Sequence, residues 1–225
     1  MFKTKISKEE VNALPVVIFD GKITLVDEPW KVKSAIEVLR NAKVVGLDTE
    51  TKPSFTRGTH HKVSLVQIST LDHCYLFRLN MIDFPAELAG FLADEEILKI
   101  GLSLRDDLVA LNKRHAFKPA GFIDIQTIAQ SYGILELSLQ KVYAIIFGKK
   151  ISKSQRLTNW ENLDLSESQQ RYAATDAWAC LQIYLRLLTE SKLTKKQLDL
   201  ILFEKAEEQR ELREQQIAKS QTEIE

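Results

Sequence analysis

Two carboxylates, Asp48 and Glu50, follow directly on the apolar segment VVGL, which predicts a buried strand. Side chains two residues apart on a strand point to the same side, so both carboxylates are expected to project together from the strand end. Paired oxygen ligands of this kind suit hard divalent cations. An acidic exit from a strand into a loop is the commoner explanation for such a pair taken alone. Further carboxylates are needed before the pair indicates a metal site.

A third carboxylate is expected at the start of the helix that follows the fourth predicted strand. Leu104, Leu108 and Leu111 recur at helical spacing and form the apolar face of that helix. Asp107 borders this face, whereas Asp106 points away from it and is expected in solvent. An aspartate that is favoured only by the helix dipole is the structural alternative. The pattern therefore selects Asp107 as the inward carboxylate.

A fourth carboxylate, Asp176, lies on the long helix predicted over residues 167–189. Cys180 and Ile183 stack on its face, and no Lys or Arg lies within one turn on that face. A buried carboxylate without a partner is costly, and a metal ion would supply the compensating charge. Tyr172, one turn earlier, places its hydroxyl beside Asp176. A Tyr and an Asp at this spacing also occur by chance, so the pair is weak in isolation.

The set is more specific than its members. Four carboxylates and a tyrosine are expected to converge from three segments of the chain, and these are Asp48, Glu50, Asp107, Asp176 and Tyr172. Such a ligand set fits phosphodiester hydrolysis with two divalent cations roughly 3.5–4 Å apart, which clamp the attacking water and the leaving oxygen. We therefore expect Mg²⁺ or Mn²⁺ as cofactors, since both favour oxygen ligands.

The elements that must position these residues alternate between strand and helix. A short hairpin is predicted between residues 16–19 and 23–26, because Asp20-Gly21 is a favoured turn. Further strands are predicted at residues 43–48, 63–69, 74–79, 97–102 and 122–125. Helices are predicted at residues 30–40, 86–92, 104–114, 125–131, 138–146 and 167–189. The pattern indicates an α/β fold with a mixed sheet.

The motifs resemble those of a known family, the DEDD exonucleases of the tyrosine subclass, with ribonuclease D-like and Werner-type exonuclease domains the most similar. The carboxylate motifs are VVGLDTE (44–50), KIGLSLRDDLVAL (99–111) and RYAATDA (171–177). Further similarity runs through KVSLVQIS (62–69), FIDIQTIA (122–129) and KSQRLTNWE (153–161). The resemblance covers residues 20–190, approximately.

This resemblance implies a ribonuclease H-like fold, in which three antiparallel strands precede parallel strands in a mixed sheet flanked by helices. It also implies a 3′-5′ exonuclease that releases nucleoside 5′-monophosphates from DNA or RNA. Asp48, Glu50 and Asp176 would bind the first cation, Asp48 would bridge to the second, and Asp107 would act through bound water. Tyr172 would orient the attacking water. Ribonuclease D carries additional helical domains after this core, so preferences that depend on them are not carried over.

The resemblance implies the domain organisation, whereas composition indicates the environment of the protein. We expect an N-terminal extension at residues 1–20, an exonuclease domain at 21–190, and a helical or disordered tail at 191–225. Equal numbers of basic and acidic residues, 31 each, argue against binding nucleic acid by bulk charge. Two cysteines, no secretory signal and no long apolar run favour a cytoplasmic protein that does not enter a membrane. A catalytically silent nucleic-acid binding domain and an endonuclease of the ribonuclease H kind remain the competing functions.

Two basic segments, residues 51–62 and 148–160, contain no acidic residue and are candidates for phosphate contacts. The alternative is that both are solvated loops. Candidate substrate contacts are Thr49, Lys149, Lys150, Lys153 and Arg156. Phe55 is expected to pack on its own domain rather than on a base, and Asp124 is expected to cap the helix that follows it.

Overall fold

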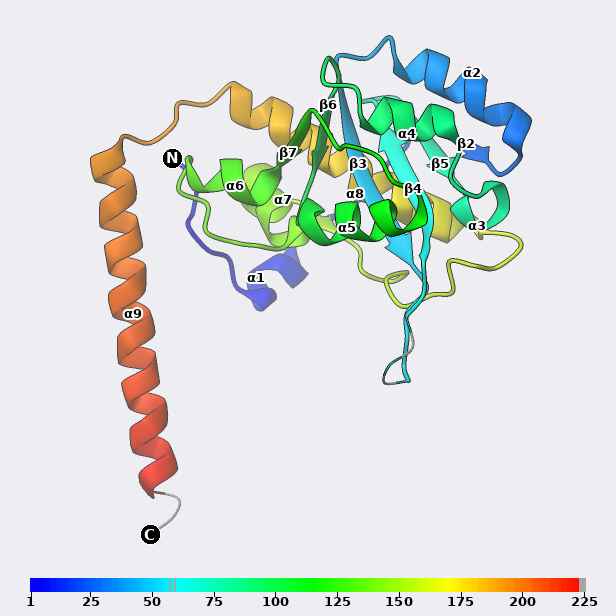
Figure 1. Ribbon diagram of the computed structural model, residues 1–225. Helices are drawn as coiled ribbons and strands as arrows, with labels where there is room; N and C mark the ends of the chain where they lie inside the picture. The colour runs from blue at the N-terminus through cyan, green and yellow to red at the C-terminus, as the bar shows by residue number, and fades with distance from the viewer. Residues whose placement is uncertain (57, 59, 223–225) are drawn as a thin grey trace.

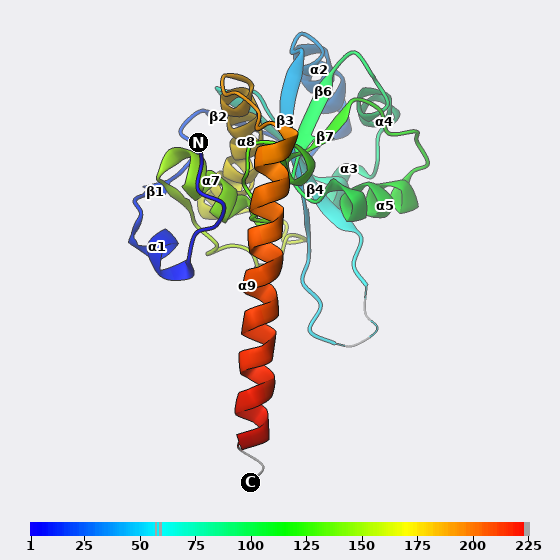
Figure 2. The same ribbon diagram turned by 90° about the vertical axis from the view of Figure 1, so that its left-hand side faces the viewer.

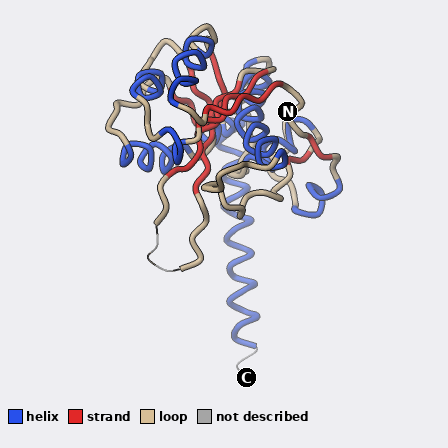
Figure 3. Tube along the Cα trace, turned by 90° about the vertical axis from the view of Figure 1, so that its right-hand side faces the viewer, coloured by secondary structure: helices blue, strands red, loops and turns tan. Residues whose placement is uncertain are grey.

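The computed structural model describes all of the chain except residues 57, 59 and 223–225. Its centre is a six-stranded mixed sheet, seen edge-on in red in Figure 3. In spatial order the strands are β2 (Lys22–Val26), β5 (His73–Phe77), β4 (Val63–Ser69), β3 (Val44–Thr51), β6 (Leu98–Gly101) and β7 (Phe122–Asp124). Strands β3, β4 and β5 are antiparallel neighbours, whereas β6 and β7 run parallel to β3 and β2 runs parallel to β5. The predicted mixed sheet is confirmed.

Helices cover both faces of the sheet (Figure 1). One face packs on α2 (Pro29–Leu39), α4 (Ala86–Leu92) and α5 (Leu104–Arg114), with the short α3 (Leu79–Ile82) at its margin. The other face packs on α6 (Ile125–Gln130), α7 (Leu139–Phe147) and α8 (Glu167–Leu188). Alternate residues of β3 and β4 enter the two cores, because successive strand side chains point to opposite faces.

Helix α8 lies directly against the backbone of β3. A methyl group added at Gly46 would lie 1.8 Å from the carbonyl oxygen of Ala177, so only glycine allows this approach. The helix begins at a capping box, in which Ser166 accepts from the Gln169 backbone and the Gln169 side chain accepts from the Ser166 backbone. This packing fixes the height of α8 above the centre of the sheet.

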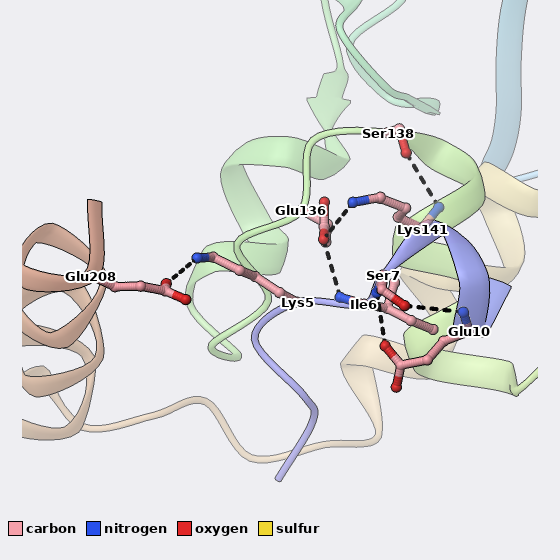
Figure 4. A network of polar contacts seen from close by, with 8 residues as sticks. All are labelled: Lys5, Ile6, Ser7, Glu10, Glu136, Ser138, Lys141 and Glu208. Atoms are coloured by element: carbon pink, nitrogen blue, oxygen red, sulfur yellow. Dashed lines mark hydrogen bonds and ion pairs between the residues drawn. The ribbon is translucent and has the colours of Figure 1, made fainter. Parts of the chain in front are cut away.

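Two peripheral parts complete the molecule. A second, small sheet joins β1 (Val16–Val17) to β8 (Lys150–Ile151), next to α1 (Lys8–Ala13). Helix α9 (Lys195–Thr222) extends away from the body in both views of the ribbon (Figures 1 and 2). Figure 4 shows an ion pair between Lys5 and Glu208 that joins α9 to the N-terminal segment. In the described part of the chain, no helix has the length and apolarity that crossing a membrane requires.

The hairpin predicted between residues 16–19 and 23–26 is wrong. Strand β1 pairs with β8 and β2 pairs with β5, in both cases in parallel. The intervening backbone is instead bound by α8: Phe19 N donates to the Thr175 hydroxyl, and the Arg171 guanidinium donates to the carbonyls of Phe19 and Gly21. These bonds to a distant helix replace the cross-strand bonds that a hairpin would have made.

Candidate active site

Three of the four predicted carboxylates lie together. Oxygen atoms of Asp48, Glu50 and Asp176 all lie within 4.8 Å of one another. The first two residues project from the same face of β3, as their alternation predicts, and this is the face that α8 covers. Asp176 directly precedes Ala177, the residue that touches Gly46. The close approach of α8 to β3 therefore brings the carboxylates of strand and helix to one point.

The fourth carboxylate, Asp107, lies in the first turn of α5 and outside that group of three. Its Oδ1 accepts a hydrogen bond of 2.5 Å from the Thr49 hydroxyl. Thr49 lies between Asp48 and Glu50 on β3, so this bond joins Asp107 to the strand that carries the other ligands. Asp106, its neighbour, is exposed as the helical pattern predicts.

Asp124 holds the start of the helix that carries Asp107. Its Oδ1 accepts from Gln126 N and its Oδ2 accepts from Leu104 N, each at 2.9 Å. The first bond confirms the predicted cap of α6. The second caps α5 as well, a role that the sequence did not reveal. Ser103, which precedes α5, adopts φ 60°, an uncommon conformation for a residue with a side chain.

Tyr172 lies on α8 one turn before Asp176, as predicted. Its hydroxyl is close enough to act as a hydrogen-bond partner of the Asp176 carboxylate. The Tyr172 ring packs beside the fully buried indole of Trp160, with 6.1 Å between the ring centroids. The tyrosine is therefore held by the core at one side and borders the carboxylates at the other.

Comparison with known protein families shows the family to which this chain belongs. The family model described as 3′-5′ exonuclease matches residues 23–192. This chain belongs to the 3′-5′ exonuclease family. The resemblance inferred from the motifs is thereby confirmed.

Individual relatives agree with this membership. The mouse bifunctional 3′-5′ exonuclease/ATP-dependent helicase WRN is 33% identical over 155 residues, which cover 66% of this chain and 11% of that protein. The crystal structure of Escherichia coli RNase D, an exoribonuclease involved in structured RNA processing, superposes with a TM-score of 0.67 and 26% identity, over 74% of this chain and 44% of the other. Trypanosoma brucei RNase D in complex with RNA U12 shares the fold, with a TM-score of 0.68 and 21% identity over 84% and 68% of the two chains. The chain thus spans only part of these relatives.

Burial raises the pKa of each carboxylate in this cluster, and neighbouring carboxylates raise the pKa of Asp48 and Glu50 further. Burial, together with Asp176 and Asp107, raises the pKa of Asp48 well above its ordinary value. Burial, followed by the charges of Asp48, Asp176 and Asp107, raises the pKa of Glu50 to about 10. Burial raises the pKa of Asp176 to about 7, although Tyr172 and Lys153 oppose the shift. So much crowded negative charge requires compensation by protons or by cations.

Asp107 and Tyr172 are shifted by the same surroundings. Burial raises the pKa of Asp107, and the hydrogen bond from Thr49 opposes this. Burial, followed by the charge of Asp176, raises the pKa of Tyr172 above its ordinary value. The phenol is therefore protonated at neutral pH, which makes it a hydrogen-bond donor rather than a general base.

The four candidate phosphate contacts of the basic segment 148–160 fall into two groups in the structure. The charge of Lys153 lowers the pKa of Asp176, and that of Arg156 lowers the pKa of Glu50, so both cations act on the carboxylates electrostatically. Lys150 instead donates to the carbonyl of Asn12 at the second sheet, and Lys149 is exposed beside it.

Glu161, which the sequence did not single out, connects the β3–β4 loop to the end of the basic segment 148–160. Glu161 lies 3.2 Å from Lys52 and 3.7 Å from His61, so it joins the two segments near the site. Its position immediately after the basic segment was the available signal. The expectation that Phe55 packs on its own domain is wrong, since 83% of it is exposed. Arg57, a basic residue of the segment 51–62, lies outside the described residues.

Proposed function

We propose that this chain removes nucleotides from the 3′ end of DNA or RNA by phosphodiester hydrolysis and releases nucleoside 5′-monophosphates. The observation that carries this proposal is the group formed by Asp48, Glu50 and Asp176 within 4.8 Å, in a chain of the 3′-5′ exonuclease family. The group combines crowded negative charge with a tyrosine at its edge. A silent binding domain would have no need for such a costly cluster.

The donor set fits two divalent cations, Mg²⁺ or Mn²⁺. All candidate ligands are carboxylate oxygens, which hard cations prefer, and their raised pKa values mark a shortage of positive charge. Asp48, Glu50 and Asp176 would hold one ion. Asp48, whose pKa responds to both Asp176 and Asp107, would be shared with a second. When bound, such ions neutralise the phosphate and lower the pKa of a coordinated water.

The chain's own groups would supply positioning. The Tyr172 hydroxyl would donate a hydrogen bond to the attacking water and so orient it beside Asp176. Asp107, in the first turn of α5, would act through bound water. Thr49 holds Asp107 through its hydroxyl and, in this proposal, contributes to the site in that way rather than by touching substrate. Preorganised groups of this kind lower the barrier because they need not reorient during reaction.

Nucleic acid would be gripped locally rather than by overall charge, since the net charge is zero. Lys153 and Arg156, whose charges lower the pKa of Asp176 and Glu50, would contact the phosphates next to the carboxylates. The structure of a family relative with bound RNA supports RNA as one substrate class. The free, buried cysteines Cys74 and Cys180 fit a reducing, cytoplasmic setting, which is part of the proposal.

Product analysis tests this function. Oligonucleotides of DNA and RNA are incubated with the protein and Mg²⁺, and the products are separated by chromatography. Nucleoside 5′-monophosphates as the main products support the proposal. Internal fragments would point to an endonuclease, and binding without products to a silent domain, so either result would overturn it.

A further inference from the structure

Gln67 on β4 is a fully buried amide without partners. Its side chain is 0% exposed, and neither Nε2 nor Oε1 has a hydrogen-bond partner among the described protein atoms. Nearly all buried polar side chains in folded proteins are hydrogen-bonded, because desolvation without a partner costs free energy. An apolar residue of the same shape would fill this space without that cost. The presence of an amide at this position therefore calls for a role beyond packing.

The position of Gln67 in the sheet supplies that role. In the antiparallel β3–β4 pair, Gln67 lies directly opposite Asp48. Side chains that oppose one another in this way project from the same face, with Cβ atoms about 4.5–5.5 Å apart. The amide of a glutamine is long enough to span this separation to an aspartate carboxylate. Across the other strand boundary, Gln67 faces the apolar Leu76, which offers it no hydrogen bond.

We propose that Gln67 is a positioning residue for Asp48, whose amide N–H group holds the carboxylate in the orientation required to bind cations. The inference rests on the proposed function, because it assigns to Asp48 a cation to bind. Carboxylates that bind metals are commonly oriented by such hydrogen bonds, and loss of the partner typically lowers metal affinity or activity by about 10–100-fold. The structure does not contain this bond, and the Gln67 side chain would have to rotate toward Asp48 across the strand pair to make it.

The test compares Gln67→Met, which keeps the length but removes the hydrogen-bonding groups, with Ser69→Ala as a matched control. Ser69 is buried on the same strand and the same face, but it donates to the Thr70 carbonyl and lies opposite Gly46. Thermal melting, Mn²⁺ affinity by direct titration, and kcat and KM on an oligonucleotide are measured for both variants.

Gln67→Met is expected to melt at or above the wild-type temperature, to bind Mn²⁺ about 10–100-fold more weakly or to lose kcat by that factor, and to keep its KM. Ser69→Ala is expected to match the wild type in Mn²⁺ affinity and kcat. Wild-type Mn²⁺ affinity and kcat in Gln67→Met would overturn the inference. If this variant does not melt cooperatively, Gln67→Leu replaces it. If the wild type degrades no nucleic acid, the proposed function fails, yet the Mn²⁺ titration still decides the role of Gln67.

Discussion

The backbone of Ala177 occupies the position that a side chain at residue 46 would need: a Cβ atom at Gly46 would lie 1.8 Å from the Ala177 carbonyl oxygen. Asp48 follows Gly46 by two residues on the same face of β3, and Asp176 is the residue before Ala177. One close contact between a strand and a helix thus sets the distance between the carboxylates that come from them.

Replacement of Gly46 by alanine is expected to push α8 away from β3. Forcing atoms into a packed interior typically costs about 1–3 kcal/mol, and the severe overlap here places Gly46→Ala at or above the upper end. Denaturant unfolding measures the loss, and activity is expected to fall with it. Gly90→Ala is the matched control, because its nearest neighbour is Arg40 Nη2 at 3.8 Å and it lies within α4. Equal stability of the two variants would contradict this account of the contact.

Loss of the double cap at Asp124 is expected to disturb the placement of Asp107. Asp124→Ala removes the acceptor of both Leu104 N and Gln126 N, and a lost cap typically costs about 1 kcal/mol. A lower unfolding free energy, by about 1–2 kcal/mol, and a reduced kcat are expected. Asp106→Ala, on the exposed side of the same helix, serves as the control and should leave kcat unchanged. A normal kcat in Asp124→Ala would show that α5 does not depend on this cap.

The metal-free protein is expected to become less stable as the pH rises. Burial and neighbouring charge raise the folded-state pKa of Asp176 to about 7 and that of Glu50 to about 10. The unfolded chain releases these protons near pH 4, so between about pH 4 and those values the folded state holds more protons. The free energy of unfolding therefore falls with pH through that window.

Divalent cations are expected to reverse this loss, since they replace the protons. Thermal melts with EDTA or with Mg²⁺ at about pH 5.5 and about pH 8.5 measure the effect, and the gain from Mg²⁺ should be larger at the higher pH. Asp176→Asn should weaken the pH dependence. A melting temperature in EDTA that stays level or rises between these pH values would refute the assignment.

Lys153 and Arg156 are expected to account for part of the salt dependence of binding. Replacement of both by alanine should weaken binding to a single-stranded oligonucleotide and reduce the slope of log K against log salt by about 1.4, at about 0.7 per cation. Lys149→Ala, an exposed lysine of the same segment, should have a smaller effect. An unchanged slope in the double variant would remove these residues from the phosphate contacts.

Local periodicity predicted much of the site. Alternation along β3 placed Asp48 and Glu50 on one face, and the leucine stripe of α5 separated Asp107 from Asp106. Both features depend on residues a few positions apart, so they are visible in sequence. The approach of Tyr172 and Asp176 to β3 follows from helical spacing only once the partner of α8 is known.

Long-range contacts explain what the sequence did not reveal. Asp20-Gly21 is a sound local turn signal, yet Arg171 and Thr175 bind that backbone from α8 and prevent the hairpin. Likewise, Glu161 binds Lys52 across more than a hundred residues, which no local pattern can show. In both places a side chain on a distant element decides the structure.

The most direct measurement follows 5′-labelled single-stranded and duplex DNA and RNA on a gel, with Mg²⁺, Mn²⁺ or EDTA, for the wild type, Asp48→Ala and Asp176→Ala. The account predicts a ladder that shortens from the 3′ end with either cation, and no shortening in EDTA or in either variant. Shortening that persists in EDTA or in the variants, or intact substrate that remains bound to the wild type, would contradict it.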